Sequence, residues 1–372
     1  MSPSPAVQEL VVAVVKIALV VGTLLGLFSG MTYIERRVLA FMQYRLGPNR
    51  TGPWGLLQPI ADGIKLFFKE EVMPAAANTW GFLAAPVVAV STALLAVAVL
   101  PYGPPFTLPS LDYLPGWLKW LWPSWLHGRT VQIQIAQVDV GLLFIFAITA
   151  LGVYGVVLAG WAANSKYSLL GGLRSSAQMF SYELALGLSW VGIIMLAGSF
   201  QITDIVDDQG ARFGGWFFGW NAFVQFPAFL VYFIAATAEV ARIPFDLPEG
   251  ETELVAGFHT EYSSMRFALI QMAEYINMIT VSVLCVNLFL GGWHPGIPGL
   301  PAEGLPGFVW WGLKVAVLLF VFIWLRGTLP RFRYDQLMHF GWKVLIPVAA
   351  VWILVTATAL TFLPALSRVV SR

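Results

Sequence analysis

The sequence predicts an all-α, polytopic membrane protein of about eight transmembrane helices, with one further amphipathic helix at the cytoplasmic membrane surface. Of the 372 residues, 58% are hydrophobic and only 11% are charged, whereas a soluble domain is about 25% charged. The mean hydropathy is +0.75. Apolar runs of about 20 residues, the length that crosses a bilayer as a helix, recur along the chain. Since no polar stretch could form a large soluble domain, residues 1–372 are predicted to be a single membrane domain.

The apolar runs define the predicted spans. They fall at roughly residues 8–33, 79–101, 137–160, 176–199, 221–241, 266–291, 308–326 and 343–364. The connecting loops alternate in charge. The first, third, fifth and seventh loops carry most of the Lys and Arg, whereas the second, fourth and sixth carry only Lys119, Arg129 and Arg212. By the positive-inside rule the odd loops are cytoplasmic and both termini lie outside.

The first loop, residues 34–78, contains the predicted amphipathic helix in "GLLQPIADGIKLFFKEE". Apolar residues such as Ile60 and Ile64 recur at helical spacing, and Asp62 with its polar neighbours forms the opposite stripe. Pro59 is tolerated because it falls in the first turn. The pattern is typical of a helix that lies on the membrane surface. Whether it is a simple anchor or part of a binding site stays open on the pattern alone.

An Arg-rich bend precedes that helix in "YIERRVLAFMQYRLGPNRTGPWG", which contains Glu35, Arg36, Arg37 and Arg45. The positive-inside rule accounts for part of this charge. Arg beside Glu at a bend is also suited to holding a polar head group or a partner subunit. The basic seventh loop, residues 327–342, supplies a second surface of Arg and aromatic residues on the same side.

Acids concentrate in and beside the fifth loop, residues 242–265. The stretch "EVARIPFDLPEGETELVAGFHTEY" contains Glu239, Asp246, Glu249, Glu251, Glu253 and Glu261, out of 20 Asp and Glu in the chain. Its two prolines break any helix, so an ordered loop is predicted. Arg242 is predicted to pair with Glu239 on one helical face. Because close carboxylates repel, we expect some of these acids to hold protons near neutral pH.

Two interpretations of the acids compete, a solvated surface loop and a path for protons. Apolar neighbours such as Phe245, Leu247 and Phe258 argue against a free loop. Further acids, Glu183 and Glu274, lie inside the flanking spans, where ionisable groups are costly and usually mark a functional path. We therefore favour the proton path.

Redox groups and metals are not predicted in this chain. Its one cysteine, Cys285, permits neither a disulfide nor a cysteine-ligated iron–sulfur cluster. The four histidines lie far apart without helical ligand spacing, so no metal site is predicted. The sequence has no basic stripe of the kind that indicates nucleic-acid binding.

Four stretches resemble one family, the H subunit of bacterial respiratory complex I (NADH:quinone oxidoreductase), which is similar to mitochondrial subunit ND-one. They are "YIERRVLAFMQYRLGPNRTGPWGLLQPIADGIKLFFKEE", "SYELALGL", "RIPFDLPEGETELVAGFHTEYSSMRFALIQMAEY" and "RGTLPRFRYDQLM". The resemblance runs in order over nearly the whole chain and is weakest in the outer loops. One departure is Val240 and Ala241, where many relatives carry Thr and Asn.

The resemblance implies a subunit of the bacterial inner membrane that forms part of a quinone chamber. Quinone, such as ubiquinone, would be the substrate, and FMN and iron–sulfur clusters would reside in partner subunits. The implied partners are the quinone-site and iron–sulfur subunits of the peripheral arm, small membrane subunits and antiporter-like subunits. The chamber residues that it implies are Glu35, Arg36, Arg37, Arg45 and Asp62. The acids that it assigns to proton coupling are Glu183, Glu239, Asp246, Glu249, Glu251, Glu253, Glu261 and Glu274.

Two alternative functions remain open from the sequence alone. A membrane-bound hydrogenase uses a homologous subunit without quinone, although the unbroken "YRLGPNRTGPWGLLQPIADGIKLFFKE" favours the quinone enzyme. A stand-alone secondary transporter is less favoured, because the sequence shows neither internal repeats nor matching interrupted helices.

Overall fold

The computed structural model describes residues 4–108, 128–247, 250 and 255–362. Over these residues the regular secondary structure is helical apart from two short antiparallel strands, β1 (Phe106–Thr107) and β2 (Thr130–Val131). Seven helices there are long and apolar enough to cross a membrane: α1 (Pro5–Met42), α3 (Thr79–Val97), α4 (Gly141–Ala162), α5 (Lys166–Ala197), α10 (Ser264–Phe289), α11 (Gly304–Thr328) and the continuous rod Tyr334–Phe362. The shorter apolar helix α8 (Phe226–Glu239) supplies the eighth predicted span. The all-α prediction is confirmed.

Shorter elements connect the spans. The rod at the C-terminal end consists of α12 (Tyr334–Phe340), a π-helical turn (Gly341–Leu345) and α13 (Ile346–Phe362). The other short elements are the 3-10 turn Pro53–Gly55, α2 (Gln58–Phe68), α6 (Ile202–Ala211), the 3-10 turns Arg212–Gly215 and Phe217–Gly219, α7 (Asn221–Val224) and the 3-10 turn Gly257–His259.

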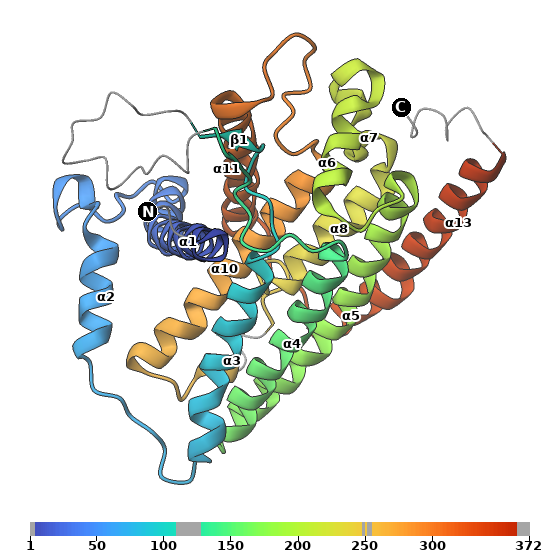
Figure 1. Cartoon of the computed structure of the whole chain (residues 1–372). Coiled ribbons are helices and arrows are strands. Elements are labelled where there is room, and N and C mark those ends of the chain that lie inside the picture. Colours follow the sequence, from blue (N-terminus) through green and yellow to red (C-terminus); the bar gives the residue numbers. More distant parts are fainter. Residues whose placement is uncertain (1–3, 109–127, 248–249, 251–254, 363–372) are drawn as a thin grey trace, which may run out of the picture.

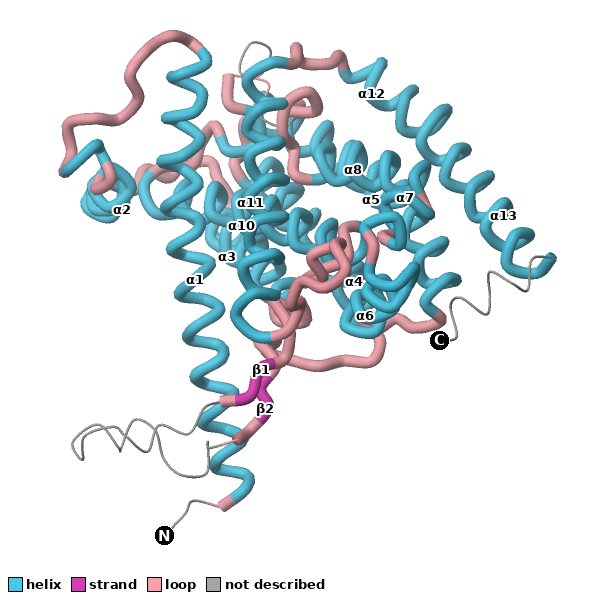
Figure 2. The backbone as a smooth tube through the Cα atoms, turned by 90° about the horizontal axis from the view of Figure 1, so that it is seen from above, coloured by secondary structure: helices cyan, strands magenta, loops and turns pink. Residues whose placement is uncertain are grey.

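The bundle is centred on α5 and α10. In the most apolar stretch of α10, 72% of the residues are buried, against 11% for α1, which lies at the edge (Figure 2). Figure 1 shows α3, α4 and α5 side by side, whereas α1 is seen nearly along its axis and therefore crosses them steeply. Small residues allow the closest approach. A Cβ atom on Gly160 would lie 2.6 Å from the Ser168 carbonyl oxygen and 3.0 Å from Gly172 Cα, so α4 and α5 meet backbone to backbone.

The odd-numbered loops gather at one end of the bundle. The Asn78 amide donates to the Ala162 carbonyl oxygen at 2.9 Å, which joins the first loop to the end of α4. The Phe332 amide donates to the Pro244 carbonyl oxygen at 3.0 Å, which joins the seventh loop to the fifth. The basic loops of the predicted cytoplasmic side therefore contact one another.

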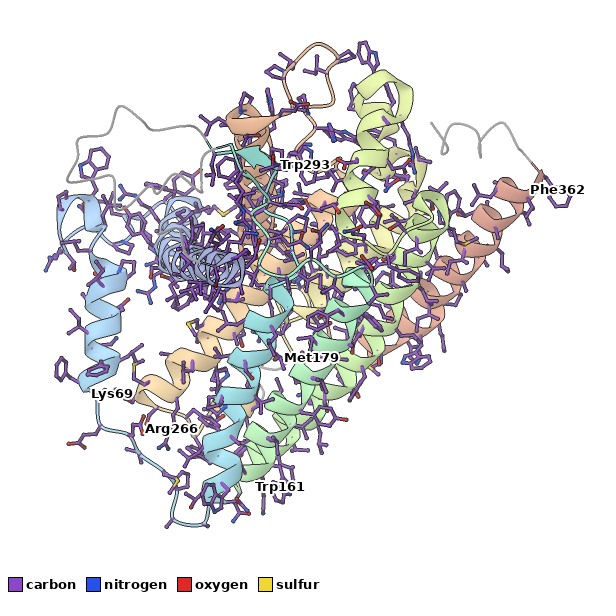
Figure 3. All side chains as sticks on the ribbon, in the orientation of Figure 1. Lys69, Trp161, Met179, Arg266, Trp293 and Phe362 are labelled. Carbon is purple, nitrogen blue, oxygen red and sulfur yellow. The ribbon has the colours of Figure 1, made fainter. Side chains whose placement is uncertain are left out.

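The even-numbered loops gather at the opposite end. The Phe217 amide donates to the Gly296 carbonyl oxygen at 2.9 Å, which joins the fourth loop to the sixth. Figure 3 labels Trp161 and Trp293 at the two ends of the molecule. This sorting agrees with the charge alternation, since loops that contact one another must lie on one side of a bilayer.

The predicted amphipathic helix is confirmed as α2, with Pro59 in its first turn. Its apolar side faces outward, with Ile60 59% and Phe68 80% exposed. Figure 1 shows α2 standing apart from the bundle. Its far end is held at the start of α10, where Ser264 Oγ lies 2.8 Å from the carbonyl oxygens of Leu66 and Lys69.

Candidate functional site

A buried ionic cluster surrounds Glu35, near the end of α1. This side chain is 3% exposed. Its Oε1 accepts from Arg242 Nη1 at 3.0 Å and from Arg326 Nη1, and its Oε2 accepts from the Tyr275 hydroxyl at 2.7 Å. The Arg242 guanidinium also lies 4.5 Å from the centre of the Tyr275 ring. A buried carboxylate is tolerated when it is paired and hydrogen-bonded in this way, so the cluster ties α1, α10, α11 and the fifth loop together.

The predicted pair of Arg242 with Glu239 is wrong. Helix α8 ends at Glu239, and Ala241 takes a left-handed conformation with φ +53°. This turn takes Arg242 off the helical face and directs it to Glu35 on α1. Burial alone would lower the pKa of Arg242, but the Glu35 carboxylate raises it above its ordinary value. Arg242 therefore stays charged inside the protein.

The described part of the acidic loop is packed into the protein. Phe245 and Leu247 are 5% and 1% exposed. Gln178 Nε2 on α5 donates to the carbonyl oxygens of Ala238 and Phe245, both at 2.7 Å. The interpretation as a free solvated loop is therefore wrong for residues 240–247.

Asp246 also has a partner that the sequence did not suggest. Its Oδ2 accepts from Arg331 Nη2 of the seventh loop at 2.7 Å. The bases that compensate the acidic loop thus come from distant parts of the chain. Three further predicted acids, Glu249, Glu251 and Glu253, lie outside the described residues.

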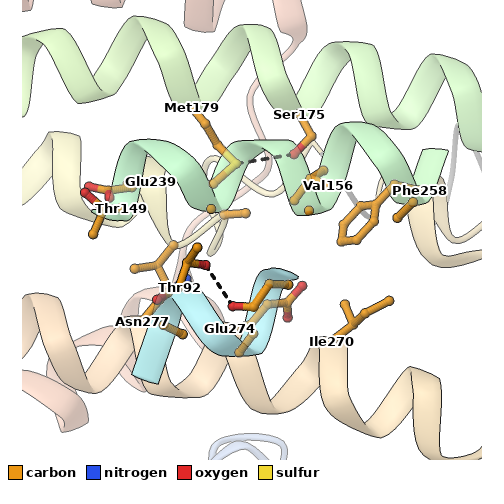
Figure 4. Close-up of a pocket in the computed structure, with 18 of the residues that line it drawn as sticks. Thr92, Thr149, Val156, Ser175, Met179, Glu239, Phe258, Ile270, Glu274 and Asn277 are labelled. Atoms are coloured by element: carbon orange, nitrogen blue, oxygen red, sulfur yellow. Dashed lines mark hydrogen bonds between the residues drawn. The ribbon is translucent and has the colours of Figure 1, made fainter. Parts of the chain in front are cut away.

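A cavity of about 60 Å³ brings Glu239 and Glu274 together among α3, α4, α5, α8 and α10. Figure 4 shows these two acids, from α8 and α10, around one pocket. The polar side chains in its lining are Thr92, Thr149, Ser175 and Asn277. A water molecule needs about 10–15 Å³ and two to four polar partners. The cavity therefore has the size and the lining to hold water between the two acids.

Two smaller cavities of about 10 Å³ each adjoin this one through shared lining residues. One is lined by Glu274 together with Arg242, Asp246 and Arg326, so it reaches the Glu35 cluster. The other is lined by Glu239 with residues deeper in the bundle. Glu274 and Glu239 each line two cavities. The three cavities therefore form a series that runs from the end of the bundle with the odd-numbered loops into its interior.

Glu183 on α5 belongs to the same region. It is 7% exposed, and its charge interacts with that of Glu239. Glu261 lies apart, in the turn between Gly257–His259 and α10, half-buried, and it lines none of these three cavities. The turn before it is pressed onto α5, since a Cβ atom on Gly171 would lie 2.7 Å from the Gly257 backbone.

The residues predicted for the quinone chamber lie in separate parts of the structure. Arg36 pairs with Asp62 of α2 at 2.5 Å on the exposed side of α1. Partial burial would raise the pKa of Asp62, but the hydrogen bond and charge of Arg36 hold it below its ordinary value. Arg45 is exposed and donates from Nε to Gln43 at 2.7 Å. Within the predicted set, Arg36 and Asp62 form an ion pair with one another, whereas the side chains of Glu35, Arg37 and Arg45 bond to residues outside the set.

Arg37 makes the second connection between α1 and the segment before α2. It donates from Nη1 to the Trp54 carbonyl oxygen at 2.6 Å and to the Tyr33 hydroxyl. Its guanidinium also lies 5.5–5.7 Å from the ring centres of Tyr33, Phe41 and Trp54. Arg36 and Arg37 therefore hold the stretch from Trp54 to Asp62 against the end of α1.

Sequence reasoning missed several residues of the site. Tyr275 and Arg326 complete the Glu35 cluster, and Gln178 fixes the acidic loop. Tyr275 follows directly after Glu274 inside α10, and Arg326 lies near the end of α11, so both were visible as polar residues of predicted spans. No local pattern indicated Gln178, whose partners lie 60 and 67 residues away.

These features define a class of protein: a multi-pass, all-α membrane protein with a linked series of buried ionisable groups. A family model described as NADH dehydrogenase matches residues 15–357, nearly the whole chain. The chain belongs to this family, as its motifs predicted.

Three relatives carry names that match the resemblance, since each is an H subunit of an NADH-quinone oxidoreductase. The one from Koribacter versatilis, numbered 2 in that organism, is 49% identical over 353 residues, which are 94% of this chain and 96% of the relative. The one from Geobacter metallireducens, numbered 1, is 49% identical, over 95% of this chain and 98% of its own. The one from Rhodospirillum rubrum is 44% identical over 358 residues, or 96% of each chain.

Proposed function

We propose that this chain is the membrane subunit of a proton-pumping NADH:quinone oxidoreductase in which quinone chemistry is coupled to a path of buried acids. The observation that carries the proposal is the series of three cavities that share Glu274 and Glu239 and begin at the Glu35 cluster. The names of the full-length relatives support the choice of reaction. NADH oxidation, FMN and the iron–sulfur clusters belong to partner subunits in this proposal.

The quinone chamber would lie between α1 and α2. Arg36 and Asp62 supply charged hydrogen-bonding groups to a polar quinone head group, and Arg37 and Trp54 fix the segment that carries them. The outward apolar side of α2 gives the isoprenoid tail a surface at the membrane. Arg45, exposed at the bend, is assigned to the mouth of this chamber rather than to its wall.

Coupling would be electrostatic. Quinone reduction changes the charge at the chamber, and the charged neighbours at the end of α1 respond. Glu35 holds Arg242 and Arg326 directly. A change in its contacts alters the charge that faces Glu274 across the adjoining cavity, and Glu239 and Glu183 follow. Asp246, Glu261 and the acids at 249, 251 and 253 are assigned to the chamber side of this path.

Orientation and partners follow from the charge of the loops. The odd loops would face the cytoplasm, where the iron–sulfur subunits of the peripheral arm dock, and both termini would lie outside the bacterial inner membrane. The antiporter-like subunits would receive the coupling along the membrane. In contrast, a hydrogenase-type complex would contain no quinone site, and a secondary transporter would purify without partners.

The test compares titratable and non-titratable side chains along the path. In the purified, reconstituted complex, Glu183→Gln and Glu239→Gln should lower quinone reductase activity and proton pumping together. We expect a loss of at least about tenfold, a conservative figure beside the usual contribution of a positioned acid–base group. Asp at either position should retain more activity, because it still exchanges protons.

Glu303→Gln is the matched control, since Glu303 is an exposed acid of the sixth loop. It should leave both activities unchanged. Normal turnover and normal pumping in both path variants would refute the proton path. If the intact complex did not reduce quinone but still reacted with hydrogen or another donor, the hydrogenase-type alternative would replace the proposal.

A further inference from the structure

The largest of the described cavities has no place in the proposed quinone or proton functions. It has a volume of about 460 Å³ and lies between α8, α11, α12 and the start of the acidic loop. This volume is within the range of about 300–1,000 Å³ that is usual for ligand pockets. Figure 2 shows α12 at the edge of the bundle, at the end where the odd-numbered loops lie. The cavity is lined by Phe233, Ile234, Thr237, Pro244, Phe245, Leu325, Leu329, Phe332, Gln336, Leu337 and Phe340; we call it the α12 groove.

The lining of the α12 groove suits hydrocarbon rather than a polar ligand. Nine of its eleven residues are apolar. The two polar side chains already have partners. Thr237 Oγ1 donates to the Ile234 carbonyl oxygen at 2.7 Å, and Gln336 Oε1 accepts from the Arg333 amide at 3.4 Å. A ligand there gains from burial of apolar surface and not from hydrogen bonds.

The rim of the groove carries positive charge. Arg333, next to the lining residue Phe332, is 78% exposed; its partner Asp335, 3.6 Å away, is 69% exposed, so solvent screens this pair and the guanidinium can still reach an anionic head group. The guanidinium of Arg174 lies 5.6 Å from the centre of the Tyr334 ring, beside Arg333 in the chain. By the charge alternation this end of the bundle faces the leaflet that is rich in anionic lipid.

The size of the groove distinguishes between apolar occupants. A helix about 10–12 Å across fills roughly 400–600 Å³ per turn. The α12 groove could therefore take only about one turn of a partner helix, whereas a slender acyl chain fits along it. We propose that the α12 groove binds an acyl chain of an anionic phospholipid whose head group lies at Arg333 and Arg174.

The site adjoins the acidic loop directly. Phe245 of the loop stacks on Phe332, with ring centres 5.6 Å apart, and both line the groove. Asp246, the next residue, is held by Arg331 at 2.7 Å. A bound acyl chain thus packs against the segment that positions Asp246, so the lipid supports the ordered start of this loop.

The experiment uses the intact complex reconstituted with phosphatidylglycerol that carries a photoactivatable group in its acyl chain. After illumination, labelled peptides are mapped by mass spectrometry. Label should concentrate on 325–340 and should be about fivefold lower with phosphatidylcholine, the factor that one Arg beside an anionic surface typically gives. Arg333→Gln should reduce that preference and Arg333→Gln/Arg174→Gln should remove it, whereas Arg45→Gln, at an exposed Arg of the first loop, should leave it unchanged.

A groove-filling variant tests the apolar part. Leu329→Trp should abolish labelling in the groove, and Leu354→Trp, at an exposed position of α13 that does not line the groove, should leave it intact. Equal label on the groove and on the α13 surface around Leu354 would overturn the proposal. So would displacement of the label by long-tailed quinone, or a cross-link from the groove to a partner subunit, because each identifies another occupant. Labelling of the wild-type complex decides the matter even if Leu329→Trp fails to assemble.

Discussion

Replacing Glu35 by Gln tests the central contact of the candidate site. Gln keeps the size of the side chain and can still accept a hydrogen bond from the Tyr275 hydroxyl. It removes the negative charge that faces Arg242, whose side chain is only 9% exposed, and Arg326, which is 32% exposed. The variant therefore leaves Arg242 as a buried cation without its partner. Loss of one member of a buried ion pair costs about 3–5 kcal/mol.

The lower figure applies here, because Gln retains a polar contact and Arg326 can turn toward solvent. We expect a penalty of about 3 kcal/mol, which is on the order of a hundredfold in an equilibrium constant. The pair of Glu9 with Arg129 supplies the control. Glu9 is 69% exposed, and exposed pairs contribute about 0–1 kcal/mol. The two substitutions remove the same charge and differ in burial.

The assay is the rate of thermal inactivation of the purified complex, followed by residual quinone reductase activity and by retention of the subunit. Glu35→Gln should accelerate inactivation by up to about a hundredfold, and Glu9→Gln should change it little. In the double variant Glu35→Gln/Arg242→Met both charges are gone, so its cost should be smaller than the sum of the single costs. Equal rates for Glu35→Gln and Glu9→Gln, with additive effects in the double variant, would refute the pairing.

Two further predictions concern the chamber and the topology. Asp62→Asn should raise the KM for long-tailed quinone about tenfold, because it breaks the charge-assisted bond to Arg36; Lys65→Gln should not, since Lys65 is 68% exposed and 3.8 Å from Asp62. The pKa of Asp62 is lower in the folded protein than in the unfolded chain. The pair with Arg36 is therefore fully formed above the unfolded-state pKa of Asp62 and is lost only as the pH falls through the folded-state pKa. The KM for quinone should be constant at neutral and alkaline pH and should rise in acid. Reporter fusions after Arg333 should mark the cytoplasm and fusions near Pro298 the outside, and the reverse result would overturn the assignment of the chamber side.

The spans and the amphipathic helix could be predicted because a bilayer imposes a minimum length on apolar helices and a helix imposes a period on its faces. Partners in space have no such local signature. Arg242 lies three residues after Glu239, yet a left-handed Ala241 turns it toward Glu35, 207 residues away. Asp246 likewise pairs with Arg331 from another loop. The sequence therefore shows which residues are charged but not how they pair, because the pairings depend on how the helices pack.

Glu35 lies between the two proposed sites, the quinone chamber and the path of acids. The family resemblance implies a role in the quinone chamber, but its hydrogen-bond partners Arg242, Arg326 and Tyr275 belong to the loop and helices that carry the acids. Arg36, the next residue, points instead to Asp62 on α2. Adjacent residues of one helix thus face the proposed chamber and the proposed path, as expected when successive side chains point about 100° apart around a helix. In the proposed function a charge change at the chamber would need no long relay, because one turn of α1 borders both proposed sites.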